Sequence, residues 1–431
     1  MKIADFDFDD APAPEPTAAA AGAHARTTVT ERFAAVMAWA SGRVAVADEE
    51  GSLTYAELDR LSDRIARFVH GLDLGPKAVV GIMCGRRRGF VAAALGVIKA
   101  GAAYAPIEPE LPLASRRRLL DLCGARLLIS TADLAGDLHR LQWLCPGLTH
   151  ILAMDAGEID ALVESPGALM SLELWDHLAG DGADDILAGG WKSAFSGQPL
   201  PAEAMANFGK NARRKAAPLI KPGARVLEIG CASGFTMRQV APLCGSYLAT
   251  DIARRNLERV EAYALAHGLD QVTTRQLAAH DVDVHPPGSF DLVIINSVVE
   301  SFPGYAYLRD VLAKVLALLA PGGAVFLGSI WDLQRRDALA ADLAAYARDH
   351  AGRGLPARRD MADDLYVPAD FFRDYAAERG GLALEFSAVE APLFDPAPYQ
   401  FDLILRPDPT QAPAAPGRRR HDACALGAQP G

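Results

Sequence analysis

Several features that define other classes of protein are missing from this chain of 431 residues. No stretch reaches the ~18 consecutive apolar residues of a membrane-spanning helix. The acidic opening, MKIADFDFDD, has neither the basic region nor the apolar run of a signal peptide. Basic residues number 43 against 54 acidic ones, and the resulting net charge of -11 is the wrong sign for a protein that binds nucleic acid. These absences predict a soluble cytoplasmic protein whose main partner is neither a membrane nor a nucleic acid.

Cysteine is scarce and scattered. None of the six cysteines forms a C-x-x-C pair or a His/Cys cluster with the spacing of metal ligands. The sequence therefore predicts reduced thiols, no disulfide framework and no metal site. The six are Cys84, Cys123, Cys145, Cys231, Cys244 and Cys424.

Apolar residues make up 50% of the chain and charged residues 23%, which is enough to bury ordinary cores. At ~150 residues per domain, the length allows two domains or three. Residues 1–27 are rich in Asp, Pro and Ala, and residues 407–431 in Pro, Ala and Gly. Both compositions predict disordered tails, with a docking segment for a partner protein as the alternative.

Between these tails the pattern predicts an α/β fold in two parts. Over residues 28–135, amphipathic stretches alternate with short apolar strands, and one long helix is expected to begin at Thr54. Residues 136–190 have no strong period and are assigned to a linker or lid. A second alternation of strands and helices occupies residues 191–406.

The strongest local motif is VLEIGCASG, residues 226–234, which joins an apolar strand to a helix. Gly230 and Gly234 carry no side chain and can adopt positive φ, so a ligand can approach the backbone closely. Asp251 ends the next strand, 21 positions after Gly230, where a carboxylate can accept hydrogen bonds from both hydroxyls of a ribose. The motif predicts a site for a nucleotide-like ligand.

The loop departs from the G-x-G-x-x-G pattern of dinucleotide-binding proteins. Glu228 precedes it, and the stretch from Cys231 to Ser233 separates the two glycines, so no tight pyrophosphate cradle is expected. A positively charged sulfonium ligand needs no such cradle, and acidic strand ends suit it.

Further segments extend this pattern: QLAAHDVD (276–283), FDLVIINSVVESF (290–302) and PGGAVFLGSIWD (321–332). Together with the glycine loop they resemble class I S-adenosylmethionine-dependent methyltransferases, which have a Rossmann-like fold. INSVVESFPGYAYL and YQFDLIL resemble more closely the methyltransferase domains embedded in nonribosomal peptide synthetases. The resemblance covers residues 191–406 and implies S-adenosylmethionine as cofactor.

The resemblance also implies where the cofactor binds. His280 or Asp281 is expected beside the adenine and Asn296 beside the methionine part, while Phe195 and Ser196 match a segment that covers the cofactor. Simpler interpretations are that His280 is a surface residue in a turn and that Cys231 is a small packing residue. The expected cofactor residues are Glu228, Gly230, Cys231, Gly234, Asp251, His280, Asp281, Asn296, Phe195 and Ser196.

In the first part of the chain, SLTY (52–55) and KAGAAYAPIEP (99–109) resemble the first two core motifs of adenylation domains. The family's Ser/Thr/Gly-rich phosphate loop with its lysine, its later ATP-binding motifs and its catalytic lysine have no counterpart here. Without such groups, charge on the α-phosphate is not stabilised. We therefore expect residues 28–135 to be a truncated adenylation stub that cannot activate an amino acid, either a platform for other domains or a structural remnant.

Methyl transfer to a hydroxyl calls for a base within hydrogen-bond reach of the acceptor. Glu300 is the candidate, because it follows the central strand at the carboxyl edge of the predicted sheet. The alternative is a charged residue at a helix start, stabilised by backbone amides. Embedded domains that methylate nitrogen resemble INSVVQYF at this place, so Glu300 and Ser301 favour oxygen as the acceptor. The expected substrate-pocket residues are Tyr305, Tyr307, Trp331 and Asp332.

By analogy with the family, the sequence predicts O-methylation of a side-chain hydroxyl on an aminoacyl or peptidyl group. A phosphopantetheinylated peptidyl carrier protein would carry that group, and other synthetase modules would be further partners. Three alternatives remain open: N-methylation of the carrier-bound aminoacyl nitrogen, a non-catalytic scaffold for synthetase modules, and an enzyme that acts on a free small molecule.

Overall fold

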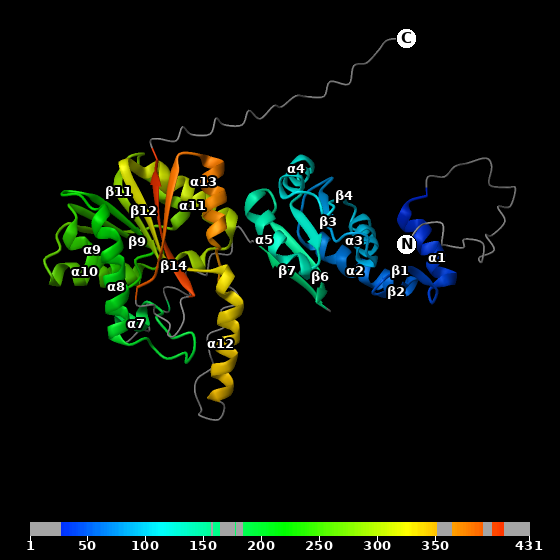
Figure 1. The fold of residues 1–431 in the computed structure, drawn as a ribbon, viewed down its shortest axis with the longest axis horizontal. Helices are drawn as coiled ribbons and strands as arrows, with labels where there is room; N and C mark the ends of the chain where they lie inside the picture. The colour runs from blue at the N-terminus through cyan, green and yellow to red at the C-terminus, as the bar shows by residue number, and fades with distance from the viewer. Residues whose placement is uncertain are drawn as a thin grey trace, which may run out of the picture. The chain divides into compact units, whose positions relative to one another are not determined.

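The computed structural model describes residues 27–156, 158–163, 177, 184–350, 364–390 and 399–408. The chain divides into two compact units (Figure 1). Unit 1 comprises Met1–Leu141 and His150–Leu162, and unit 2 comprises Gln142–Thr149 and Val163–Gly431. Nearly all of the two predicted tails lies outside the described residues.

Unit 1 begins with two helices that are capped in the same way. Helix α1, Val29–Ala40, starts after Thr28. Helix α2, Tyr55–Gly71, starts after Thr54, as the sequence predicts. In α2 the Glu57 amide donates to the Thr54 hydroxyl over 3.3 Å, and the Thr54 amide donates to the Glu57 carboxylate over 2.8 Å. This reciprocal pair satisfies two amides that have no partner inside the helix.

The main sheet of unit 1 has the strand order β4-β3-β5-β6-β7. Its strands are β3 (Val79–Met83), β4 (Ala103–Pro106), β5 (Leu127–Ser130), β6 (His150–Ala156) and β7 (Glu158–Val163). Strands β6 and β7 fall within residues 136–190, which the sequence assigned to a linker. Ile151 and Leu152 of β6 are fully buried beside β5. An apolar run this short shows no period from which a strand can be assigned.

Close packing of α2 on α3 (Arg88–Lys99) depends on a glycine in α3. A Cβ atom at Gly96 would lie 2.7 Å from the Cβ of Ile65 and 2.8 Å from the carbonyl oxygen of Ser62.

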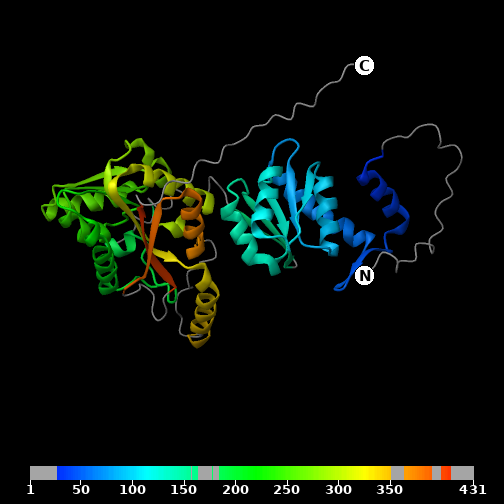
Figure 2. The same ribbon diagram turned by 45° about the horizontal axis from the view of Figure 1, so that its top comes forward.

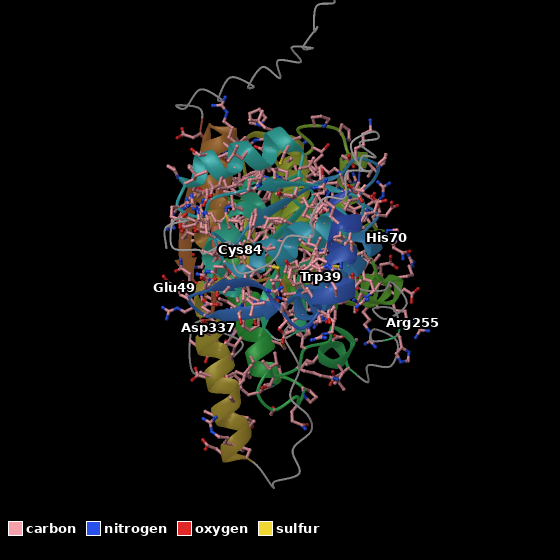
Figure 3. The ribbon with its side chains drawn as sticks, turned by 90° about the vertical axis from the view of Figure 1, so that its right-hand side faces the viewer. Trp39, Glu49, His70, Cys84, Arg255 and Asp337 are labelled. Carbon is pink, nitrogen blue, oxygen red and sulfur yellow. The ribbon has the colours of Figure 1, made fainter. Side chains whose placement is uncertain are left out.

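The hairpin of β1 (Val44–Asp48) and β2 (Gly51–Thr54) precedes α2. Trp39 on α1, labelled in Figure 3, is 65% exposed.

Unit 2 is built on a seven-stranded sheet with the order β10-β9-β8-β11-β12-β14-β13. The strands are β8 (Arg225–Ile229), β9 (Ser246–Asp251), β10 (Val272–Gln276), β11 (Phe290–Asn296), β12 (Leu319–Trp331), β13 (Leu382–Ala388) and β14 (Gln400–Pro407). Strands β8 to β12 pair in parallel, and β14 is antiparallel to both β12 and β13. This doubly wound arrangement confirms the predicted Rossmann-like fold.

Helices cover both faces of this sheet (Figures 1 and 2). On one face, α8 (Ala202–Ala216), α9 (Phe235–Val240) and α10 (Arg254–Ala266) pack with buried strand residues in one apolar cluster. The other face carries α11 (Tyr305–Leu318) and α13 (Ala369–Arg379). The short helix α7 (Asp185–Ala188) leads into α8.

The strand order reverses between the neighbours β8 and β11. After β8 the next strand, β9, is added on one side of the sheet, and after β11 the next strand, β12, is added on the other side. Crevices outside the carboxyl ends of strands at such a point are the usual ligand sites of open α/β sheets. Strand β14 is antiparallel to β12, so its first residue, Gln400, pairs with Trp331 at this same edge.

The remaining expectations concern thiols, metals and membranes. No disulfide joins the described cysteines, which are Cys84, Cys123, Cys145, Cys231 and Cys244. Within the described ranges, no group of three or more His, Cys, Asp or Glu side chains is placed to hold a metal ion. Among the same residues, no helix combines the length and apolar character needed to cross a bilayer.

Candidate active site

A cavity of unit 2 lies at the carboxyl edge of the sheet, between the ends of β8, β9, β11 and β12 and the start of β14. Its lining also includes the segment that follows α7. The lining residues are Gly189, Gly190, Trp191, Lys192, Phe208, Glu228, Ile229, Gly230, Cys231, Ala232, Phe235, Thr236, Asp251, Ile252, Asn256, Leu277, Ala278, Ala279, Asn296, Ser297, Val298, Glu300, Ser301, Phe302, Tyr307, Trp331 and Gln400.

The glycine loop after β8 turns sharply, and its residues Gly230, Cys231 and Ala232 line this cavity. Gly230 has φ +72°, and a Cβ atom there would lie 2.6 Å from Cγ2 of Val298. The amides of Gly230 and Cys231 both donate to the carbonyl oxygen of Thr250 on β9, over 2.8 and 2.9 Å. The loop therefore needs glycine at its first turn, as the sequence predicts.

Asp251 ties this loop to the end of β9. One carboxylate oxygen accepts from the amide of Ala232 over 2.8 Å, and the other accepts from the amide of Ala253 over 2.8 Å. The side chain is buried and lines the cavity. A single carboxylate thus fixes the glycine loop and presents negative charge to the cavity.

Glu228 lies beneath the loop in a buried polar cluster. The hydroxyl of Tyr247 donates to its carboxylate over 2.7 Å. Burial raises the pKa of Glu228 to about 7, and the charge of Asp251 acts in the same direction. Beside it, the Asn296 amide nitrogen donates to the hydroxyl of Thr236 over 3.0 Å.

Glu300 stands at the end of β11, in the short 3-10 helix Val299–Ser301. The hydroxyl of Ser297 donates to its carboxylate over 2.6 Å, and its backbone carbonyl accepts from the amide of Leu365 over 2.9 Å. A helix of three residues has a weak dipole. The position of Glu300 in the cavity lining therefore favours a role toward a ligand over a role as a helix-start charge.

Several polar atoms around the cavity have no hydrogen-bond partner among the described residues. They are Oδ1 of Asn256, Oδ1 of Asn296, Nε1 of Trp191, and both Oε1 and Nε2 of Gln400. All four residues line the cavity. Because native structures leave few buried polar atoms unpaired, such a group around one cavity indicates a polar ligand.

Eight of the residues expected from the sequence line the cavity. They are Glu228, Gly230, Cys231, Asp251, Asn296, Glu300, Tyr307 and Trp331. Cys231 is only 4% exposed, and burial raises the pKa of its thiol well above the ordinary value. This favours the interpretation of Cys231 as a packing residue.

The other expected residues lie outside the lining: Phe195, Ser196, Gly234, His280, Asp281, Tyr305 and Asp332. Gly234 has φ +87° and opens α9. The His280 ring is hydrogen-bonded to the hydroxyl of Tyr307 over 2.9 Å, which places it just behind a lining residue. The Tyr305 hydroxyl donates to the carbonyl oxygen of Tyr366 over 2.8 Å.

Of the four remaining residues of this group, Asp281 lies beside His280, with its carboxylate 3.5 Å from Nε2 of that ring. The other three make local contacts. Asp332 accepts from the amide of Gln334 over 3.0 Å and so caps a turn. Phe195 packs edge-on against Tyr346, with ring centroids 5.6 Å apart. The amide of Ser196 donates to the hydroxyl of Ser193 over 3.3 Å.

The polar lining residues that sequence reasoning missed include Trp191, Lys192, Asn256 and Gln400. Gln400 belongs to the quoted segment YQFDLIL, but only the antiparallel course of β14 brings it to the carboxyl edge of the sheet. A pattern of alternating apolar residues shows that a strand is present and does not show its direction. Asn256 lies on α10, and no motif marks it.

Two family models match separate parts of the chain. Residues 33–177 match the family model described as AMP-binding enzyme, and residues 227–325 match the one described as methyltransferase domain. The chain joins an AMP-binding segment to a methyltransferase domain.

Individual relatives match parts of the chain. A probable non-canonical nonribosomal peptide synthetase of Salinispora arenicola is 39% identical over 160 residues, 37% of this chain and 2% of the synthetase. Chondramide synthase of Chondromyces crocatus is 36% identical over 156 residues, 36% of this chain and 4% of its own length. The chain thus spans only a small fraction of these synthetases.

A ubiquinone biosynthesis O-methyltransferase of Rhizobium etli is 28% identical over 201 residues, 47% of this chain and 75% of that enzyme. Among solved structures, the magnesium protoporphyrin IX methyltransferase of Synechocystis is 15% identical, with a TM-score of 0.34. That match covers 54% of this chain and 91% of the solved one.

The methyltransferase domain uses S-adenosylmethionine as cofactor, and the cavity suits this ligand. Gly230 and its loop neighbours Cys231 and Ala232 lie in the cavity lining, so a ligand can contact this loop. Asp251 supplies an acidic strand end, and Oδ1 of Asn296 is a buried acceptor with no partner among the described residues. A ligand with a sulfonium, an amino group and ribose hydroxyls meets all three features.

The raised pKa of Glu228 should make the stability of the domain depend on pH. Its folded pKa, about 7, lies above the ordinary 4.5, so the unfolded chain loses this proton first as the pH rises. Stability should therefore fall between about pH 4.5 and 7. The variant Glu228→Gln keeps an oxygen acceptor for Tyr247 and cannot ionise. Without ligand at pH 8, its free energy of unfolding should therefore be higher than that of the wild type by about 1–3 kcal/mol.

Urea unfolding followed from pH 4 to pH 8 measures this difference. Glu385→Gln is the matched control, because the Glu385 side chain is 64% exposed and its removal should leave the pH profile unchanged. Parallel profiles for the wild type and Glu228→Gln would show that the carboxyl of Glu228 is not held protonated.

Proposed function

We propose that the chain is the methyltransferase of a nonribosomal peptide pathway and that it O-methylates a side-chain hydroxyl of an aminoacyl or peptidyl group on a carrier protein. The observation that carries the proposal is the position of Glu300 in the same cavity as the glycine loop and Asp251. The synthetase relatives support the pathway, and the O-methyltransferase relative supports oxygen as the acceptor.

Within this proposal, each element has a part in binding the cofactor. Asp251 accepts hydrogen bonds from ribose hydroxyls, while Asn296 and the backbone of Gly230 hold the methionine part. His280 or Asp281 contacts the adenine, and the other cofactor residues proposed are Glu228, Cys231, Gly234, Phe195 and Ser196. When bound, S-adenosylmethionine supplies an electrophilic methyl group on a sulfonium.

Glu300 prepares the acceptor. Its carboxylate accepts the proton of the acceptor hydroxyl as that O–H bond breaks, which leaves an electron pair on oxygen for the new bond to carbon. Ser297 donates to the same carboxylate and fixes its orientation. Tyr305, Tyr307, Trp331 and Asp332 form the proposed surroundings of the acceptor, and Phe302 and Trp331 help the cavity to exclude water.

The two parts of the chain have different tasks in this proposal. Residues 191–406 carry the methyl transfer. Residues 28–135 are a stub that does not activate amino acids, and residues 136–190 connect the two, although β6 belongs to the sheet of unit 1. The proposal of an inactive stub is supported by residues 28–135 themselves, which contain neither the phosphate loop nor the catalytic lysine of adenylation domains. The proposed partners are a carrier protein and other synthetase modules.

Removing the Asp251 carboxylate tests cofactor binding. Asp251→Ala should weaken binding of S-adenosylmethionine by about 100-fold, since charge-assisted hydrogen bonds to ribose and the support of the loop are both lost. Calorimetry measures the affinity. Asp283→Ala is the control, because the Asp283 side chain is 60% exposed and outside the cavity lining. A wild type that does not bind the cofactor at millimolar concentration would refute the proposed function.

Replacing Glu300 tests the base. Glu300→Gln should lower kcat by about 10²- to 10⁴-fold with cofactor affinity unchanged, because the amide cannot take the proton. Intact-protein mass spectrometry of loaded carrier proteins follows the gain of one methyl group. Unchanged turnover would exclude Glu300 as the base, and a methyl group found on the backbone nitrogen would exclude O-methylation.

An assay of amino-acid activation tests the proposal that residues 28–135 are an inactive stub. With the intact chain, ATP–pyrophosphate exchange should stay at background for all twenty amino acids, because nothing stabilises charge on the α-phosphate. A complete adenylation domain serves as positive control. Exchange above background with any amino acid would contradict the inactive stub and leave the methyltransferase proposal standing.

A further inference from the structure

Gln400 occupies an unusual position for an amide side chain. It is the first residue of β14, which starts at the carboxyl edge of the sheet because it runs antiparallel to β12. The side chain is 5% exposed and lines the cavity next to Trp331, its partner across the two strands. Buried strand positions normally hold apolar residues, so this amide needs an explanation.

Neither polar atom of the Gln400 amide has a hydrogen-bond partner among the described residues. A second buried amide in the same unit shows the usual arrangement. Asn211 donates through Nδ2 to Asp402 over 2.9 Å and accepts through Oδ1 from the amide of Glu390 over 3.1 Å. An unpaired donor and an unpaired acceptor on one buried side chain indicate a ligand that offers both partners.

The sheet order places Gln400 at the acceptor end of the cavity. The glycine loop and Asp251 follow β8 and β9, and two strands, β11 and β12, separate β8 from β14. At the usual strand spacing, β14 lies roughly 14 Å from β8. Glu300 follows β11, and β11 lies between β8 and β14 in the strand order. The Gln400 amide is therefore positioned away from the cofactor loop, beyond the proposed base.

We propose that Gln400 is a specificity-determining residue for the acceptor and that it recognises the α-amino and carbonyl groups of the aminoacyl unit. Its Oε1 accepts from the substrate N–H, and its Nε2 donates to the substrate carbonyl oxygen. In an aminoacyl unit, the N–H donor and the carbonyl acceptor lie on either side of the α-carbon. They therefore match the unpaired acceptor and the unpaired donor of the Gln400 amide. The inference rests on the proposed function and names the part of the substrate that is recognised.

Binding of small probes to the full chain, with S-adenosylhomocysteine at saturation, tests this assignment. Serinamide carries the α-amino and carbonyl groups in a stable form, and 3-hydroxypropanamide lacks only the amino group. Titrations followed by saturation-transfer NMR give both affinities. The wild type should prefer serinamide by about 10-fold or more, and Gln400→Met should bind serinamide about 10- to 100-fold more weakly and lose the preference.

Gln271→Met is the matched control. Gln271 is partly buried in the same unit, donates to the carbonyl oxygen of Ala241 over 2.9 Å, and does not line the cavity. This variant should keep the wild-type preference. In all three proteins, the affinity for S-adenosylhomocysteine should agree within about 2-fold, because Gln400 is assigned to the acceptor end.

The outcomes separate the two proposals. A wild type that does not bind S-adenosylhomocysteine refutes the proposed function. If the wild type binds it, equal serinamide affinity in Gln400→Met, or no serinamide binding to the wild type, overturns the role of Gln400 alone. Weaker S-adenosylhomocysteine binding in Gln400→Met also overturns it, because the amide would then serve the cofactor.

Discussion

The arrangement of the whole site depends on one carboxylate. Asp251 accepts from the amide of Ala232 in the glycine loop and from the amide of Ala253 at the start of the next loop. These bonds join the carboxyl ends of β8 and β9, and the amides of Gly230 and Cys231 reinforce the junction at Thr250. The negative charge that a cofactor would meet is therefore the same charge that shapes the loop.

Backbone strain concentrates at this edge of the sheet. Three residues other than glycine have positive φ just past parallel strands or at their carboxyl ends: Ala232 after β8 (+44°), Ser297 after β11 (+56°) and Ser329 near the end of β12 (+57°). Such conformations persist only where surrounding contacts impose them, and they gather at functional sites. The Ser329 amide donates to Asp402 on β14, and Ser297 carries the hydroxyl that orients Glu300.

The sequence predicted those features that depend on local pattern. The helix start at Thr54, the turn at Gly230 and the acid at Asp251 each follow from residue types at fixed spacing. It did not predict β6, whose apolar run is too short to show a period, nor the place of Gln400, which depends on the direction of a strand. Strand direction is a tertiary property, set by pairing between distant segments.

The charge of the cavity limits what it can bind. Its lining brings together three carboxyl side chains, Glu228, Asp251 and Glu300, and a single lysine, Lys192. Nucleotides with a pyrophosphate or triphosphate would place their negative charge against these acids, and the loop from Cys231 to Gly234 lacks the pattern that binds a pyrophosphate. A cationic ligand, such as one that carries a sulfonium group, is attracted by these acids instead.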